Sequence, residues 1–173
     1  SNALYKWHDP ARPKVRELNP DVLVWNTGSG TATVAALTHG ESIGLNFALE
    51  FVRRFPRTQV VIVPCAVGSS GFTPNANGTW DPDSAATPNL FNNAVAAITA
   101  CLAATGGTIL AALWSQGEND RSTMTEIQWA AAFDNLVAKL KTAPGLAVIK
   151  FILGSMTPGE TAAGGATAAS IAA

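Results

Sequence analysis

Short apolar runs alternate along this chain with longer segments in which apolar residues recur every three or four positions. The runs cover residues 21–25, 60–63, 108–114 and 147–153, and they predict buried strands. The segments with helical spacing cover residues 41–54, 89–104 and 123–141. This alternation of strands and helices predicts an α/β fold, a parallel sheet with helices on both faces and right-handed crossovers.

The third helical segment carries the clearest local signals. Thr123 and Glu126 have the spacing of a capping box, which predicts the helix start. The apolar positions that follow predict the buried face of this helix, formed by Ile127, Ala130, Phe133, Leu136, Val137 and Leu140.

Polar, glycine-containing segments follow the predicted strands, beginning at Asn26, Cys65, Trp114 and Gly154. The carboxyl ends of parallel strands share one edge of a sheet, and open α/β sheets bind their ligands at that edge. We therefore expect these segments to meet along one rim and to form the site.

Length and composition narrow the functional classes. The 173 residues fit one domain over residues 1–160, followed by a low-complexity tail of Ala, Gly and Thr over 161–173. The formal net charge of −1 gives no reason to expect nucleic acid or an anionic membrane as partner. No apolar run approaches the roughly 20 residues that span a bilayer. Two cysteines and two histidines without ligand spacing do not favour a zinc site.

The block Trp114–Asp120 concentrates the candidate chemistry. Gln116 and Asn119 are neutral amide donors that could stabilise an oxyanion, although either could instead bond the loop backbone. Glu118 and Asp120 are candidates for acid–base chemistry. The alternatives are that Asp120 caps a helix and that Glu118 is a buried tie within the loop.

A second glycine-containing turn, Gly68-Ser69-Ser70-Gly71, could present backbone N–H groups to a ligand. An ordinary turn between strand and loop is the alternative. The turn Gly28-Ser29-Gly30 lacks the third glycine of a dinucleotide fingerprint, because Thr33 stands there.

Together these segments resemble the SGNH hydrolases, in particular their sialate O-acetylesterase and acetylxylan-esterase-like branch. Residues Trp114–Asp120 match a Trp-x-Gln-Gly-Glu-x-Asp block at every fixed position. Ala66–Ser70 looks like an Ala-Val-Gly-Gly-Thr block, with Ser69 in place of the second glycine. The resemblance implies a three-layer α/β/α sandwich with a central parallel sheet, the flavodoxin-like SGNH fold. It also implies a serine esterase that removes acetyl groups from a carbohydrate or another small ester through an acyl-enzyme, without cofactor or metal.

The resemblance also implies roles for individual residues. The nucleophile of the family lies in a Gly-Gln-Ser-Asn block, and this chain opens with Ser1-Asn2-Ala3. Either Ser1 is the nucleophile, with the preceding glycine, glutamine and first strand outside the 173 residues, or these residues are an expression-vector remnant. The Asp-x-x-His block of the family is not present in the sequence. The oxyanion would bind the N–H groups of Ser1 and Gly68 and the amide of Gln116 or, as in the wider superfamily, of Asn119.

Two other functions stay open at this point. The first is an inactive carbohydrate-binding module in which Trp80 and Trp114 stack on sugars. The second is a flavodoxin-like nucleotide binder that uses the turns at Gly28 and Gly68 as helix N-termini. Few Lys or Arg residues lie near these turns, which counts against the nucleotide binder.

Overall fold

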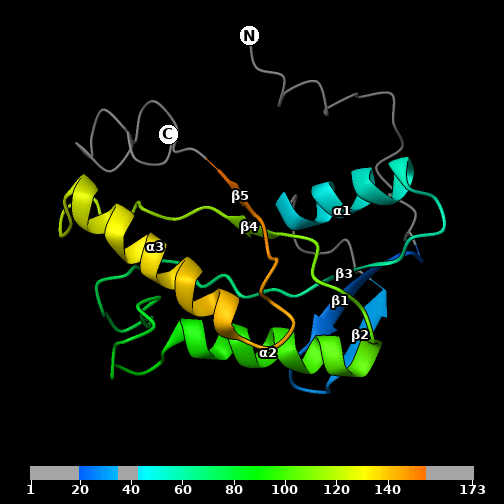
Figure 1. The fold of residues 1–173 in the computed structure, drawn as a ribbon, viewed down its shortest axis with the longest axis horizontal. Coiled ribbons are helices and arrows are strands. Elements are labelled where there is room, and N and C mark those ends of the chain that lie inside the picture. Colours follow the sequence, from blue (N-terminus) through cyan, green and yellow to red (C-terminus); the bar gives the residue numbers. More distant parts are fainter. Residues whose placement is uncertain (1–19, 35–42, 155–173) are drawn as a thin grey trace, which may run out of the picture. The chain divides into compact units, whose positions relative to one another are not determined.

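The computed structural model describes residues 20–34 and 43–154. Its elements, labelled in Figure 1, are β1 (Val22–Asn26), β2 (Thr31–Val34), α1 (Ile43–Arg54), β3 (Val60–Ile62), α2 (Leu90–Thr105), β4 (Ala112–Trp114), α3 (Glu126–Thr142) and β5 (Phe151–Leu153). The described residues fall into two compact units, residues 20–24, 33–34 and 43–62 in the first and residues 25–32 and 63–154 in the second.

One three-stranded sheet has the order β2-β1-β3. β1 and β3 are parallel, with Val22 opposite Val60. Helix α1 buries Leu45, Ala48 and Val52 against this sheet, as the helical spacing predicts. Phe55, which also has the helical spacing, lies just past the helix and is 53% exposed.

Strand β2 is a departure from the predicted alternation of strands and helices. It follows β1 after only a short turn, so two strands are consecutive. The turn closes through the Gly30 N–H, which donates to the Asn26 carbonyl at 2.8 Å. Gly30 has a φ of 66°, a left-handed conformation that glycine adopts readily and that lets the chain begin a second strand.

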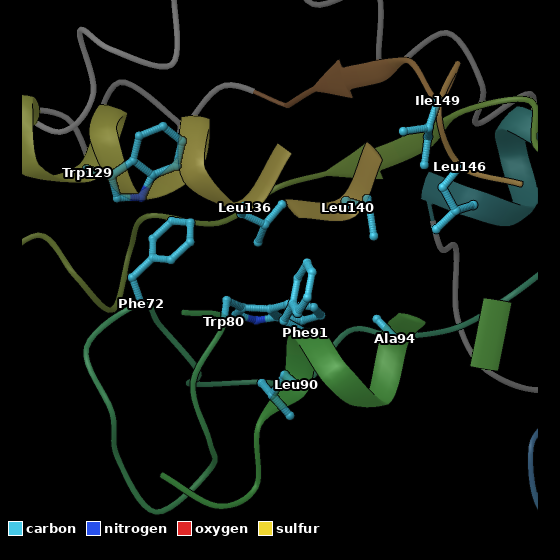
Figure 2. Close-up of a cluster of buried hydrophobic side chains, with 10 residues drawn as sticks. All are labelled: Phe72, Trp80, Leu90, Phe91, Ala94, Trp129, Leu136, Leu140, Leu146 and Ile149. Atoms are coloured by element: carbon cyan, nitrogen blue, oxygen red, sulfur yellow. The ribbon is translucent and has the colours of Figure 1, made fainter. Parts of the chain in front are cut away.

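In the second unit, β4 and β5 form a parallel pair with Ala112 opposite Phe151. Helices α2 and α3 pack against each other through a cluster of buried side chains, shown in Figure 2. The cluster consists of Phe72, Trp80, Leu90, Phe91, Ala94, Trp129, Leu136, Leu140, Leu146 and Ile149. It is the larger of the two hydrophobic clusters in the described part of the chain. It contains side chains from the segment that follows β3 and contacts the segment that precedes α3.

The described strands therefore form one three-stranded and one two-stranded sheet. This arrangement shows a mixed α/β fold, consistent with an α/β esterase, but it does not confirm the single central sheet of a three-layer sandwich. β4 and β5 are also shorter than their apolar runs predict. Among the described residues, no helix is long and apolar enough to cross a membrane.

Helix α3 begins two residues later than the sequence predicts. Thr125 is the N-cap, and it forms the capping box with Gln128 rather than Thr123 with Glu126. The Thr123 N–H instead donates to the Asp120 carbonyl at 2.9 Å, within a turn that precedes the helix. Ile127 lies half a turn out of phase with Leu136 and is 82% exposed, whereas Trp129 shares the helix face of Leu136 and is 1% exposed. The predicted burial of Ile127 is wrong, whereas Leu136 and Leu140 are buried as predicted.

Candidate active site

Asp120 lies at the centre of the candidate site and is 0% exposed. Its carboxylate accepts hydrogen bonds from the Phe72 N–H at 2.8 Å, from the Thr73 N–H at 3.0 Å and from Gln116 Nε2 at 2.5 Å. No ion pair to Asp120 occurs in the described part of the chain, so these donors compensate for its loss of water. The carboxylate is not the N-cap of α3, which is Thr125. Asp120 thus joins the loop after β3 to the loop after β4.

Gln116 is buried and is bonded at both ends of its amide. Its Nε2 donates to Asp120, and its Oε1 accepts from Trp129 Nε1 at 3.0 Å. Because an amide NH₂ carries two hydrogens, one N–H of Gln116 is left without a partner among the described residues. The side chain is therefore fixed in place and keeps one donor available.

Side-chain hydrogen bonds hold the turn at Gly68 in place. The hydroxyl of Ser70 donates to the Val67 carbonyl at 2.6 Å and accepts from Trp80 Nε1 at 3.0 Å. Asn75 Nδ2 donates to the Ser69 carbonyl at 3.0 Å. Within residues 20–34 and 43–154, the backbone N–H groups of Gly68 and Ser69 have no hydrogen-bond partner, and both residues are exposed. The turn is thus held rigidly and presents two free donors.

At two residues of this turn the backbone favours or requires glycine. Ser69 has a φ of 57°, the left-handed conformation that favours glycine, and it occupies the position where the resembling block has its second glycine. At Gly71, a Cβ atom would lie 2.5 Å from Asp120 Oδ1, so the buried carboxylate requires glycine there.

Gly117 turns the chain so that neighbouring side chains of the block face opposite ways. Its φ is 139°, and Gln116 and Asp120 on either side are buried while Glu118 and Asn119 are exposed. The interpretation of Glu118 as a buried tie is therefore wrong. Asn119 makes no side-chain hydrogen bond within the described residues, so its amide has no fixed orientation.

The two tryptophans proposed as sugar-stacking surfaces lie within the aromatic interior. Trp80 is 8% exposed, and its ring meets Trp114 edge-on at a centroid distance of 5.2 Å. Trp114 is half-buried and also packs against Phe72 at 6.2 Å and Phe133 at 5.6 Å. Trp80 is therefore too buried to stack on a carbohydrate.

The loops after the strands meet in pairs within the second unit. Thr27, after β1, and Cys65–Val67, after β3, line one cavity of about 190 Å³ together with Asn93 of α2. The Gly154 N–H donates to the Trp114 carbonyl at 2.7 Å. Burial raises the pKa of the Cys65 thiol to about 11, which disfavours it as a nucleophile at neutral pH.

Ser1, the candidate nucleophile, lies outside the described residues. Over residues 20–34 and 43–154, no group of three His, Cys, Asp or Glu side chains could hold a metal ion. Sequence reasoning missed Trp129, although its helical spacing from Phe133 and Leu136 is the signal that would have placed it on the buried face. The fixed glutamine and the two free N–H groups give this site the elements of an oxyanion-binding surface.

Comparison with known proteins identifies a family of carbohydrate esterases. The family model described as "SASA: Carbohydrate esterase, sialic acid-specific acetylesterase" matches residues 5–170 of the chain. No curated protein matches the chain.

Proposed function

Because the chain belongs to the SASA family of carbohydrate esterases, we propose that it is a serine esterase that removes acetyl groups from a carbohydrate. The observation that carries this proposal is the buried Asp120 carboxylate, which ties the Gly68 turn to Gln116. This connection supports the proposal, because it links the segment of the Gly68 turn to the Gln116 amide, and backbone N–H groups and amides are both donors that an oxyanion can accept from.

The proposed reaction proceeds through an acyl-enzyme. The hydroxyl of Ser1 passes its proton to a base and attacks the ester carbonyl, and the base then returns the proton to the carbohydrate oxygen as the C–O bond breaks and the alcohol leaves. The carbonyl oxygen becomes an oxyanion and accepts hydrogen bonds from the N–H groups of Ser1 and Gly68 and from a side-chain amide. Water then attacks the acetyl-serine, releases acetate and restores the hydroxyl.

Gln116 is the side-chain donor in this proposal, rather than Asn119. Donors that are fixed before the reaction stabilise an oxyanion best, since no reorganisation is needed when charge develops. Both ends of the Gln116 amide are bonded within the protein, whereas Asn119 is exposed and makes no side-chain bond in the described residues. Glu118 is exposed at the same turn, and we assign it no step.

The test is hydrolysis of p-nitrophenyl acetate and of an O-acetylated sialic acid by the full-length protein and by single variants. We expect Ser1→Ala to abolish turnover and Gln116→Ala to lower kcat by about 100- to 1000-fold. Asn119→Ala is the matched control and should retain wild-type kcat. Thermal unfolding of each variant shows whether the fold is intact.

Each part of the proposal has its own contrary result. Equal kcat for Gln116→Ala and the wild type would overturn the assignment of the oxyanion donor. Full activity of Ser1→Ala would place the nucleophile elsewhere. A folded wild type that binds the acetylated sugar and never hydrolyses it would instead support an inactive carbohydrate-binding module.

A further inference from the structure

We propose that Trp129, together with Asp120, is a positioning residue that fixes the orientation of the Gln116 amide. The inference rests on the proposed esterase function, because Gln116 is the side-chain oxyanion donor in that reaction. Trp129 lies on α3, away from the block that carries Gln116, and nothing in its own sequence surroundings indicates a role in catalysis.

The Trp129 ring is held so firmly that its N–H has one fixed direction. The residue is 1% exposed. Its ring stacks on Phe133 at a centroid distance of 5.4 Å and meets Phe72 edge-on at 5.9 Å. Figure 2 shows Phe72 and Trp129 as neighbours in the cluster. From this position Nε1 donates to Gln116 Oε1 at 3.0 Å. Because leaving a buried indole N–H without a partner costs free energy, this hydrogen bond stabilises the pair of Trp129 and Gln116.

The two partners of Gln116 select the same orientation of its amide. Trp129 Nε1 can only donate, so it requires the amide oxygen, and the bonded Asp120 oxygen can only accept from an amide NH₂ while the carboxylate is ionised. If the Gln116 amide were flipped, its NH₂ would face the N–H of Trp129, and its oxygen would face the carboxylate of Asp120. Both contacts would be repulsive in a buried site, so the flip is excluded. The unpartnered N–H of Gln116 therefore points in a single direction.

The start of α3 sets where this donor lies. The Trp129 N–H donates to the carbonyl of the N-cap Thr125 at 2.9 Å, so Trp129 belongs to the first hydrogen-bonded turn. Thr125 also follows the turn in which the Asp120 carbonyl accepts from the Thr123 N–H. Asp120 and Trp129, the two partners of the Gln116 amide, therefore both lie in the short segment that contains the Asp120 turn and the start of α3.

The first experiment measures kcat and KM for acetyl ester hydrolysis by full-length Trp129→Phe, which keeps a large aromatic ring and removes the N–H. We expect kcat to fall about tenfold with KM changed less than about twofold, a smaller loss than deletion of the donor itself. Trp25→Phe is the matched control. Trp25 is 3% exposed and its Nε1 has no partner within the described residues, so its kcat should stay at the wild-type value.

A double-mutant cycle separates positioning from general stability. If Trp129 acts through the amide of Gln116, Trp129→Phe should have no further effect on kcat in a Gln116→Ala background. A merely structural tryptophan would lower kcat by the same factor in both backgrounds. Should Trp129→Phe fail to fold, replacement of Trp129 by β-(3-benzothienyl)alanine keeps the shape of the ring, lacks the N–H and serves the same comparison.

The outcomes distinguish this inference from the proposed function. An active wild type with impaired Gln116→Ala and unchanged Trp129→Phe would overturn the inference alone. Equal factors in the two backgrounds would also overturn it. A folded full-length protein without esterase activity would overturn the proposed function, and the inference with it. The tenfold loss that disappears in the Gln116→Ala background would support both.

Discussion

Ser69 has a left-handed backbone, with a φ of 57°, at an exposed position beside the candidate oxyanion donor Gly68. This conformation costs a non-glycine residue about 1–2 kcal/mol, while glycine loses about 0.5–1 kcal/mol of extra entropy on folding. We predict that Ser69→Gly raises the free energy of unfolding by about 0.5 kcal/mol or more in urea denaturation. Ser122→Gly is the control, and it should destabilise the chain because Ser122 is exposed and has no positive φ.

Gly71 is required by its closeness to the buried carboxylate. A Cβ there would lie 2.5 Å from Asp120 Oδ1, and both oxygens of Asp120 are already hydrogen-bonded. We predict that Gly71→Ala lowers the free energy of unfolding by about 1–3 kcal/mol. In the same assay Gly68→Ala should cost far less, since a Cβ at Gly68 would meet nothing within 4 Å. Equal losses for the two variants would contradict this account of the turn.

Cys65 allows a prediction about pH. Burial raises the pKa of its thiol from the ordinary 9.0 to about 11, so at pH 8 it ionises about 100-fold less than a free thiol. Iodoacetamide should therefore alkylate folded Cys101→Ala protein about 100-fold more slowly than the urea-unfolded chain. The unfolded chain loses this proton first, so the contribution of Cys65 to stability is lost as pH rises from about 9 to about 11. Rapid alkylation of the native protein at pH 8 would show that the thiol is neither buried nor neutral.

At the scale of elements, the start of α3 is the feature on which the site depends. The structure assigns its capping box to Thr125 and Gln128. We predict that Thr125→Ala lowers the free energy of unfolding by about 1 kcal/mol, since the hydroxyl bonds an N–H that the helix leaves unpaired. Glu126→Ala should have a smaller effect on thermal unfolding, because Glu126 only adds charge to the first turn. The reverse order would favour the capping box that the sequence predicts.

Most elements could be predicted because their signals are local. The spacing of apolar residues locates α1 and α2, and runs of β-branched residues locate β1 and β3. The errors fall where local signals compete. Thr123 and Thr125 both suit an N-cap, and only the bond from Thr123 N–H to the Asp120 carbonyl decides between them. Strand β2 was missed because its short run follows a glycine turn that also fits an irregular loop.

For the molecule as a whole, the cluster between α2 and α3 supports the candidate site, because Trp129 and Phe72 belong to it. Leu136 lies in the same cluster and is 2% exposed. We predict that Leu136→Ala lowers the free energy of unfolding by about 2–5 kcal/mol in chemical denaturation. The control on the same helix is Ile127→Ala, whose side chain is 82% exposed and should change stability by less than about 0.5 kcal/mol. A large loss at Ile127 would support the helix face that the sequence predicts.

The candidate site could be predicted only in part. Gly68 and Gln116 were identifiable because both lie in segments that follow strands and match the blocks of the resembling family. The functions of Asp120 and Trp129 could not be read in the same way. Asp120 bonds the N–H of Phe72, 48 residues away, and Trp129 bonds Gln116 across the start of a helix. Which residues become such partners depends on how distant segments pack together, and the pattern of residues along the sequence does not contain that information.

The sequence by itself determined the positions of most helices and strands and the family to which the chain belongs, because propensity, periodicity and a short block of residues are local properties. Tertiary structure alone decided which amide of the block is buried and oriented, which threonine caps α3 and why residue 71 must be glycine. The physical reason is the buried charge of Asp120. A carboxylate removed from water requires donors on every side, and these donors come from segments that only the folded chain brings together.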